Sequence, residues 1–463
     1  MKRWIRHPLA WLLVFTFFHG VVYAALAHPW QAPDEYLHYE YLRLIDAKRS
    51  LSLSAEDRSS AMQWQVADTM RLFQHSRFRL LPTLPEAEFR AIPTPLGSKV
   101  FTPQPPLYYL LSLPIYWALR SHSVLTQLYA LRMFSVALHV LTVWLTYLLA
   151  TRIFVAPGSE LKRLAAGAWV ALWPTYTFIS ASYNNDNLAP PLVAGALLLL
   201  VLGLQRRGEM RLWLAGALFC LLAALTKLTA WAMLPVLFLA LVFNAGLLLR
   251  SERPRRRAAG GFLLLLGGGG IVAFALPLLV PFRIPADVAR TLRLDPEALV
   301  RLSAFLGELP PVDWGWWSTF MLDSFSAQFG WLFNWLPPSL ALGLRLLFLA
   351  LAAACLVMLV RALIVGRRRP ASLDVLGTIL LVAGVAAGAL FMAAQYIAAP
   401  SWYPPQGRYL FPFISAVGIL AVMGWEAFWP VRLRPSALLA GLLLAAAFDV
   451  YSWGVLLIPF FYL

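Results

Sequence analysis

The sequence predicts an all-α polytopic membrane protein, a bundle of about eleven transmembrane helices. Three observations lead to this class. The 463 residues are 60% hydrophobic and only 13% charged, a composition outside the range of soluble globular domains. Apolar runs long enough to cross a hydrocarbon core of about 30 Å recur along the whole chain. Short basic clusters separate many of these runs.

The first apolar run follows a basic start formed by Lys2, Arg3 and Arg6. This arrangement is shared with secretory signal peptides, but we interpret the run as a retained span because an acidic cluster follows it directly. The eleven runs lie at about residues 8–27, 125–150, 164–181, 188–204, 212–228, 230–249, 260–281, 338–360, 372–398, 409–428 and 436–460.

The basic clusters between the runs predict the orientation. They lie at residues 152–163, 206–211, 250–257, 361–369 and 432–434. If the spans alternate, all five clusters lie on the side of the N-terminus, as the positive-inside rule requires. The N-terminus is then cytoplasmic, in a bacterial-type inner or plasma membrane. The net charge of +16 is explained by these loops and predicts no nucleic-acid partner.

Two long loops lie on the outer side in this topology, at residues 28–124 and 282–337. Within the first loop, PPLYYLLSLPIYW at 105–117 is too short for a comfortable span, so we interpret it as an interfacial helix. The chain then divides into a transmembrane module at 1–281, which includes the first loop, the second loop, and C-terminal transmembrane helices at 338–463.

Four polar groups follow or precede spans on the predicted outer face. Ionisable groups at a membrane boundary are costly and mark functional candidates. The groups are Asp34, Glu35 and His38 after the first span; SYNNDN at 182–187, with Tyr183, Asn185 and Asp186; Thr226 and Lys227; and PPQGRY at 404–409, with Gln406 and Arg408.

Each group also has a purely structural interpretation. Pro33 followed by two acids suits the start of a helix, and an Asn- and Asp-rich run suits a turn. Lys227, Arg408 and Arg132 at the predicted outer ends of spans are also typical of interfacial anchors.

The functional interpretation combines these groups into one site. In a helix, Asp34 and His38 lie four residues apart on one face, so Asp34 is a candidate general base and His38 its hydrogen-bond partner or a metal ligand. Asp186 adds a second acid. The cations Lys227, Arg408 and Arg132 favour the binding of an anionic headgroup, and phosphate is the expected ligand. A divalent cation is a further candidate, with Asp34, His38 and Asp186 as its ligands.

The sequence shows no nucleotide-binding motif at a credible position. GGGG at 267–270 lies inside an apolar run and is better explained by close helix packing. An activated sugar or another source of energy must then come in another form, and a lipid phosphate carried in the bilayer fits. Asp449, near the middle of the last run, has no functional interpretation from sequence.

Several motifs in order resemble the GT-C superfamily of polyprenyl-phosphate-sugar glycosyltransferases. QAPDEYLHYEYLRLI at 31–45 resembles its first-loop acidic motif, and PDE followed by His is similar to the related DUF2142 type. TPQPPLYYLL at 102–111 resembles the PPL element of aminoarabinose and protein mannosyl transferases. ALRMFSVALHV, SYNNDN, LTKLTA and QGRYLFP follow in the expected order, so the resemblance covers about the first 250 residues and a last motif near 406.

The resemblance implies a GT-C-type bundle that transfers a sugar, with inversion, from a polyprenyl-phosphate donor to a lipid, glycan or protein acceptor outside the membrane. Asp34 or Glu35 would be the catalytic base and Asp186 a second acid. Substrate contacts are also expected from His38, Gln104, Arg132, Tyr183, Asn185 and Gln406, and from Lys227 and Arg408, which the charge argument above supports more than the resemblance does. Gln104 departs from the aminoarabinose transferases, which have lysine directly before PPL.

Two alternatives stay open. A lipid-linked oligosaccharide polymerase or ligase would also have a large outer loop, although the early PDE motif speaks against it. A lipid or sugar transporter would place ionisable groups near the midplane and would show internal repeats.

Overall fold

A computed structural model gives the structure, which describes residues 7–51, 53, 57, 60–72, 85, 87–88, 91, 104–206, 209–279, 313–330, 334–366, 373–398 and 406–462. Over these residues the regular structure is helical apart from one isolated bridge between Phe329 and Asn334. The predicted all-α class is therefore confirmed.

Eight helical segments in the described part are long and apolar enough to cross a membrane. Such helices satisfy all their backbone hydrogen bonds internally, as the bilayer interior requires. They are Pro8–Leu26, Val124–Ile153, Asn185–Gln205, Leu228–Leu249, Pro338–Ile364, Val375–Tyr396, Gly407–Ala427 and Val431–Tyr462. The predicted number of eleven is not confirmed.

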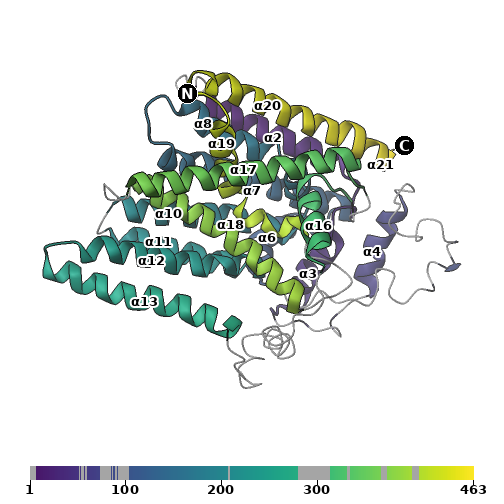
Figure 1. The fold of residues 1–463 in the computed structure, drawn as a ribbon. Helices are drawn as coiled ribbons and strands as arrows, with labels where there is room; N and C mark the ends of the chain where they lie inside the picture. The colour runs from purple at the N-terminus through teal and green to yellow at the C-terminus, as the bar shows by residue number, and fades with distance from the viewer. Residues whose placement is uncertain are drawn as a thin grey trace.

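The other predicted runs also contain helices. Helix α11 (Met210–Ala224) is short, and α13 (Pro254–Leu279) packs along α12 (Met233–Leu249), as Figure 1 shows. The remaining long elements are α2 (Pro8–Leu26), α7 (Val124–Ile153), α10 (Ala189–Gln205), α17 (Pro338–Gly366), α18 (Leu373–Ala398), α19 (Ile414–Ala427) and α20 (Arg434–Tyr451).

The predicted run at 164–181 is not one continuous helix. It is divided into α8 (Glu160–Ala171) and α9 (Pro174–Ser180), with a break at Leu172 and Trp173. Pro174 explains the break, because proline has no N–H to continue the ladder and its ring clashes with the preceding turn, whereas it suits the first position of a new helix.

Shorter helices gather at one end of the bundle, the end at which the C-terminus lies (Figure 1). They are α3 (Glu35–Lys48), α4 (Ser60–Arg71), α6 (Leu107–Ala118) and α16 (Trp314–Ser326). The predicted helix at 105–117 is thus present as α6, while its place at a membrane interface stays a prediction. Most of the predicted loop at 282–337 lies outside the described residues.

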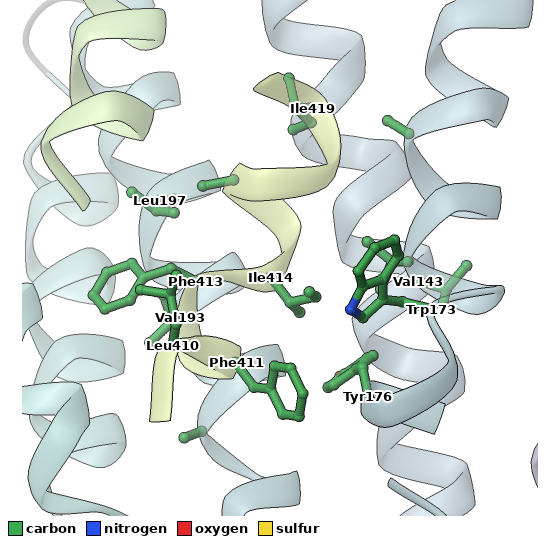
Figure 2. Packing of buried hydrophobic residues seen from close by; sticks show 14 of the residues in the cluster. Val143, Trp173, Tyr176, Val193, Leu197, Leu410, Phe411, Phe413, Ile414 and Ile419 are labelled. Carbon is green, nitrogen blue, oxygen red and sulfur yellow. The ribbon is translucent and has the colours of Figure 1, made fainter. Parts of the chain in front are cut away.

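The segment before α19 is anchored in the core. Phe411, Phe413 and Ile414 are almost fully buried, and Figure 2 shows Phe411 and Ile414 on the side of Trp173 and Tyr176, while Phe413 points the other way, past Val193. The 3-10 helix η5 (Gly407–Phe413), which begins this segment, is therefore held on both sides.

The first and last long helices are joined by a buried polar contact. Asp449 on α20 accepts from Tyr23 on α2 at 2.8 Å, and its other oxygen lies 2.7 Å from His19 Nε2. The second ring nitrogen of His19 lies 3.1 Å from the carbonyl oxygen of Ala171. Asp449, which has no functional interpretation from the sequence, thus has a packing role within the bundle.

Candidate active site

The four polar groups of the sequence meet at the end of the bundle where α3 and α6 lie. Arg408 Nη2 donates to Asp34 Oδ2 at 2.6 Å, and Arg408 Nη1 lies 3.9 Å from Asp186 Oδ2. Lys227 in turn contacts Asp186. Residues from four distant segments therefore form one alternating chain of acids and cations, in the order Asp34, Arg408, Asp186, Lys227.

Tyr409 lies against both cations of this chain. Its ring centroid is 4.9 Å from Lys227 Nζ and 5.5 Å from the guanidinium carbon of Arg408. A cation over an aromatic face is stabilised by the ring quadrupole. The ring therefore lies against two basic side chains, and burial together with the neighbouring Arg408 holds the pKa of Lys227 well below its usual value, an effect that Asp34 opposes.

Asp34 occupies an unusual backbone conformation just before α3. Its φ is +64°, the left-handed region, and its side chain makes no capping hydrogen bond to the helix. Such a conformation costs free energy for a non-glycine residue and persists where surrounding contacts enforce it. Asn184 Nδ2 supplies one of these contacts by donating to the carbonyl of Pro33 at 3.1 Å. The carboxylate is thereby turned away from the helix and toward Arg408.

Asp34 is the most accessible of the four charged groups, with 26% of its side chain exposed against 3% for Asp186 and 6% for Arg408. Burial raises the pKa of Asp34, but Arg408, His38 and Lys227 lower it by more, so the pKa lies below its usual value. The carboxylate is therefore ionised and reachable at neutral pH, as a general base must be.

Glu35, the neighbouring acid, has a different environment. It is fully buried, and its two oxygens accept from Arg132 Nε at 2.8 Å and Arg132 Nη2 at 2.6 Å. The same carboxylate accepts from the backbone N–H groups of Trp30 and Tyr183 at 3.0 and 2.9 Å. A carboxylate with this many internal donors stabilises the loop and has no access to a substrate.

Arg132 is equally enclosed. It is fully buried, and besides Glu35 it donates to the carbonyls of Ala24, Ala27 and His28 at 2.7 to 3.1 Å. The expectation that Arg132 binds a phosphate does not fit this geometry, because its charge is already neutralised by Glu35. The Arg132 side chain instead joins the end of α2 to the start of α3.

His38 lies on the face of α3 that is turned toward α6. Its Nδ1 is 2.6 Å from the hydroxyl of Tyr109. Burial lowers the pKa of His38, and although Asp34 opposes this effect, the pKa is about 3. The imidazole is therefore neutral at physiological pH and serves as a hydrogen-bond partner in the site.

The first-loop residue Gln104 is also part of the cluster. Its side-chain oxygen accepts from Asn185 Nδ2 at 3.1 Å, and Asn185 also donates to the carbonyl of Thr226 at 3.2 Å. Tyr183 is buried, and its hydroxyl lies 2.8 Å from Ser112 Oγ on α6. Gln406 is partly buried directly before η5.

Among the residues that the structure describes, a metal site is not preformed. Within the described residues no group of three or more His, Cys, Asp or Glu side chains is arranged to hold an ion. The two carboxylates predicted as ligands, Asp34 and Asp186, both lie within ion-pair distance of Arg408. Cationic side chains thus occupy the position between them that a divalent ion would need.

Sequence reasoning missed several members of the site. Tyr109 and Ser112 belong to a segment that is strongly apolar overall, and Asn184 was grouped with its neighbours without a role. The paired tyrosines in PPLYYLL were the available signal, since buried tyrosines need a hydrogen-bond partner.

Comparisons with known proteins give structural neighbours only. No family model and no curated protein matches the sequence. Among solved structures, ArnT from Cupriavidus metallidurans bound to undecaprenyl phosphate is similar over 95% of this chain and 64% of that chain, at 15% identity and a TM-score of 0.46.

Two structures from Archaeoglobus fulgidus are similar as well. AglB with an inhibitory peptide and a dolichol-phosphate is matched over 95% of this chain and 55% of that chain, at 13% identity and a TM-score of 0.45. An oligosaccharyltransferase in complex with Zn and sulfate is matched over 75% of this chain and 44% of that chain, at 15% identity and a TM-score of 0.40.

This chain spans less than two thirds of the length of each neighbour. TM-scores below 0.5 assign neither a fold family nor a reaction. What the helices themselves establish is that the chain is an integral membrane protein.

Proposed function

We propose that the protein is a membrane glycosyltransferase that moves a sugar from a polyprenyl-phosphate donor to an acceptor hydroxyl at the extracytoplasmic face, with inversion at the anomeric carbon. The acceptor is a lipid, a glycan or a protein. One observation supports this function above the others: a partly exposed carboxylate, Asp34, lies 2.6 Å from a buried arginine that has further donors to offer.

The reaction needs the two chemical groups that this contact joins. Asp34 takes the proton of the acceptor hydroxyl as the acceptor oxygen bonds to the anomeric carbon. The bond from that carbon to the phosphate oxygen breaks, and its electron pair stays on the lipid phosphate. Arg408 and Lys227 stabilise the charge that grows there. A single displacement of this kind inverts the anomeric centre.

The remaining site residues hold these groups in place. His38 and Asn184 lie beside the Asp34 loop, while Asn185 connects the Gln104 segment with the carbonyl of Thr226, next to Lys227. Fixed geometry of this kind is what converts bound reactants into a near-attack arrangement. Glu35 and Arg132 stabilise the loop that carries Asp34 and take no direct part in the transfer.

A release assay tests the proposal. Purified protein is incubated with a panel of polyprenyl-phosphate monosaccharides and candidate acceptors, and free polyprenyl phosphate is measured. We expect turnover with at least one donor, and a loss of about 10²- to 10⁴-fold in Asp34→Asn, the usual contribution of a general base.

The control is Glu88→Gln, which removes an exposed carboxylate from the same loop and should leave turnover unchanged. Full activity of folded Asp34→Asn would exclude Asp34 as the base. No turnover with any donor, together with protein-dependent lipid or sugar flux in vesicles, would favour the transporter instead.

A further inference from the structure

Arg408 has fewer partners than its burial demands. Its side chain is 6% exposed, yet within the described part of the chain Nε and Nη1 have no hydrogen-bond partner. Nη1 lies 3.9 Å from Asp186, beyond hydrogen-bond distance. Buried polar groups are nearly always hydrogen-bonded, so an unpartnered guanidinium edge indicates that an acceptor belongs there.

The geometry of a guanidinium decides where that acceptor binds. A phosphate is held by two parallel N–H bonds along one edge of the planar group. Both available edges include Nη2, one together with Nε and the other together with Nη1. Nη2 is the atom that donates to Asp34. Nη2 has two N–H groups, one on each edge, so an anion in a fork always uses Nη2 as well. On the edge that Asp34 uses, the anion competes for the same hydrogen, and on the other edge it shares the charge of the guanidinium with the carboxylate.

We propose that Arg408 is shared between Asp34 and the donor phosphate, and that its pairing passes from the carboxylate to the phosphate during the reaction. This inference rests on the proposed function. In the free enzyme Arg408 pairs with Asp34. In the donor complex the phosphodiester takes the free edge and weakens the pair, which makes Asp34 more available to the acceptor hydroxyl.

The charge balance of the transfer fits this exchange. As the acceptor proton moves to Asp34, the carboxylate loses its negative charge. As the glycosidic bond to phosphate breaks, the leaving phosphate gains one. A single fixed guanidinium therefore stays neutralised throughout, and it holds the product phosphate most tightly while Asp34 is protonated.

The second cation does not share this position. Lys227 contacts Asp186, which has 3% of its side chain exposed. Lys227 therefore retains a carboxylate partner when Asp34 loses its charge. Of these two basic side chains, Arg408 is the one that donates to Asp34, so the exchange is assigned to Arg408.

The inference predicts that the ionised carboxylate opposes phosphate binding, and the coupling is reciprocal. A long-chain polyprenyl monophosphate without sugar is the probe, and its Kd is measured in detergent for each variant. We expect Asp34→Asn to bind it about tenfold more tightly than wild type, because Arg408 no longer serves two anions. Asp34→Ala should do the same and serves as a second variant.

Two controls test whether the effect of Asp34→Asn on phosphate binding acts through Arg408. Glu88→Gln removes one negative charge from the same loop without contact to Arg408 and should bind like wild type. In an Arg408→Lys background the gain from Asp34→Asn should shrink, because lysine cannot form the shared fork.

The outcomes separate the two claims. Tighter binding by Asp34→Asn, lost in the Arg408→Lys background, supports the shared arginine. Equal or weaker binding by both folded Asp34 variants overturns the sharing and leaves the proposed glycosyltransferase intact. No binding of the probe by wild type or any variant overturns the proposed function itself.

Discussion

Asp34 and Glu35 are neighbours in the chain with opposite properties. Asp34 lies before the helix, is partly exposed and accepts from Arg408, whereas Glu35 opens α3, is fully buried and is saturated with internal donors. The sequence left open which of them is the base. The difference depends on partners 97 and 374 residues away, which no local pattern specifies.

Replacing Glu35 by glutamine should lower the free energy of unfolding, and any loss of activity should follow from that loss of stability. Loss of its charge leaves Arg132 as an uncompensated buried cation, and breaking a buried pair in this way costs about 3–5 kcal/mol. Denaturant unfolding in detergent measures this free energy, with Glu88→Gln as a control expected to stay within about 0.5 kcal/mol of wild type. A variant as stable as wild type but inactive would instead make Glu35 the base.

The pH dependence of turnover should follow Asp34. Its pKa lies below the usual value of about 3.9, because Arg408, His38 and Lys227 outweigh the effect of burial. A base works while deprotonated, so kcat/KM, which reports the free enzyme, should stay level as pH falls to about 4 and decline only below it.

His38 adds no transition in this range, since its pKa is about 3. A kcat/KM profile from about pH 4 to pH 8 checks both groups. An acid limb centred between about pH 6 and 7, the ordinary histidine range, would show that a charged histidine is disruptive and that this assignment is wrong.

At the scale of elements, the position of Arg408 depends on the close approach of η5 to α16. Gly407 N–H donates to Ser324 Oγ at 2.8 Å. A Cβ at Gly407 would meet the backbone of Met321 and Phe325, at 2.6 Å from Phe325 Cα. The two helices can therefore lie this close only with glycine at position 407.

Gly407→Ala should consequently displace the residue that follows it. We expect a loss of turnover on the order of 100-fold, the effect of moving a catalytic group by about 1 Å. Gly246→Ala in α12 is the matched control, since a Cβ there meets nothing within 4 Å and alanine favours a helix. Equal activity of the two variants would show that the approach does not position Arg408.

At the scale of the whole molecule, the helical membrane class and the meeting of four polar groups followed from hydrophobic runs and from charges at their ends. The predicted number of spans is not confirmed: among the described residues Pro174 divides one run, α11 is shorter than a typical span, and α13 is not among the eight apolar helices. The members supplied by α6 were also missed, because the apolar character of that segment hides the contacts of Tyr109 and Ser112.

The contact between His19 and Asp449 joins residues 430 positions apart. During synthesis, the first helix enters the membrane long before its partner exists, since chains grow by about 5–20 residues per second. Until the last helix arrives, His19 and Tyr23 lack the carboxylate that they share in the finished bundle. The Asp34–Arg408 pair is completed almost as late, long after both partners of the Asp186–Lys227 contact have been synthesised.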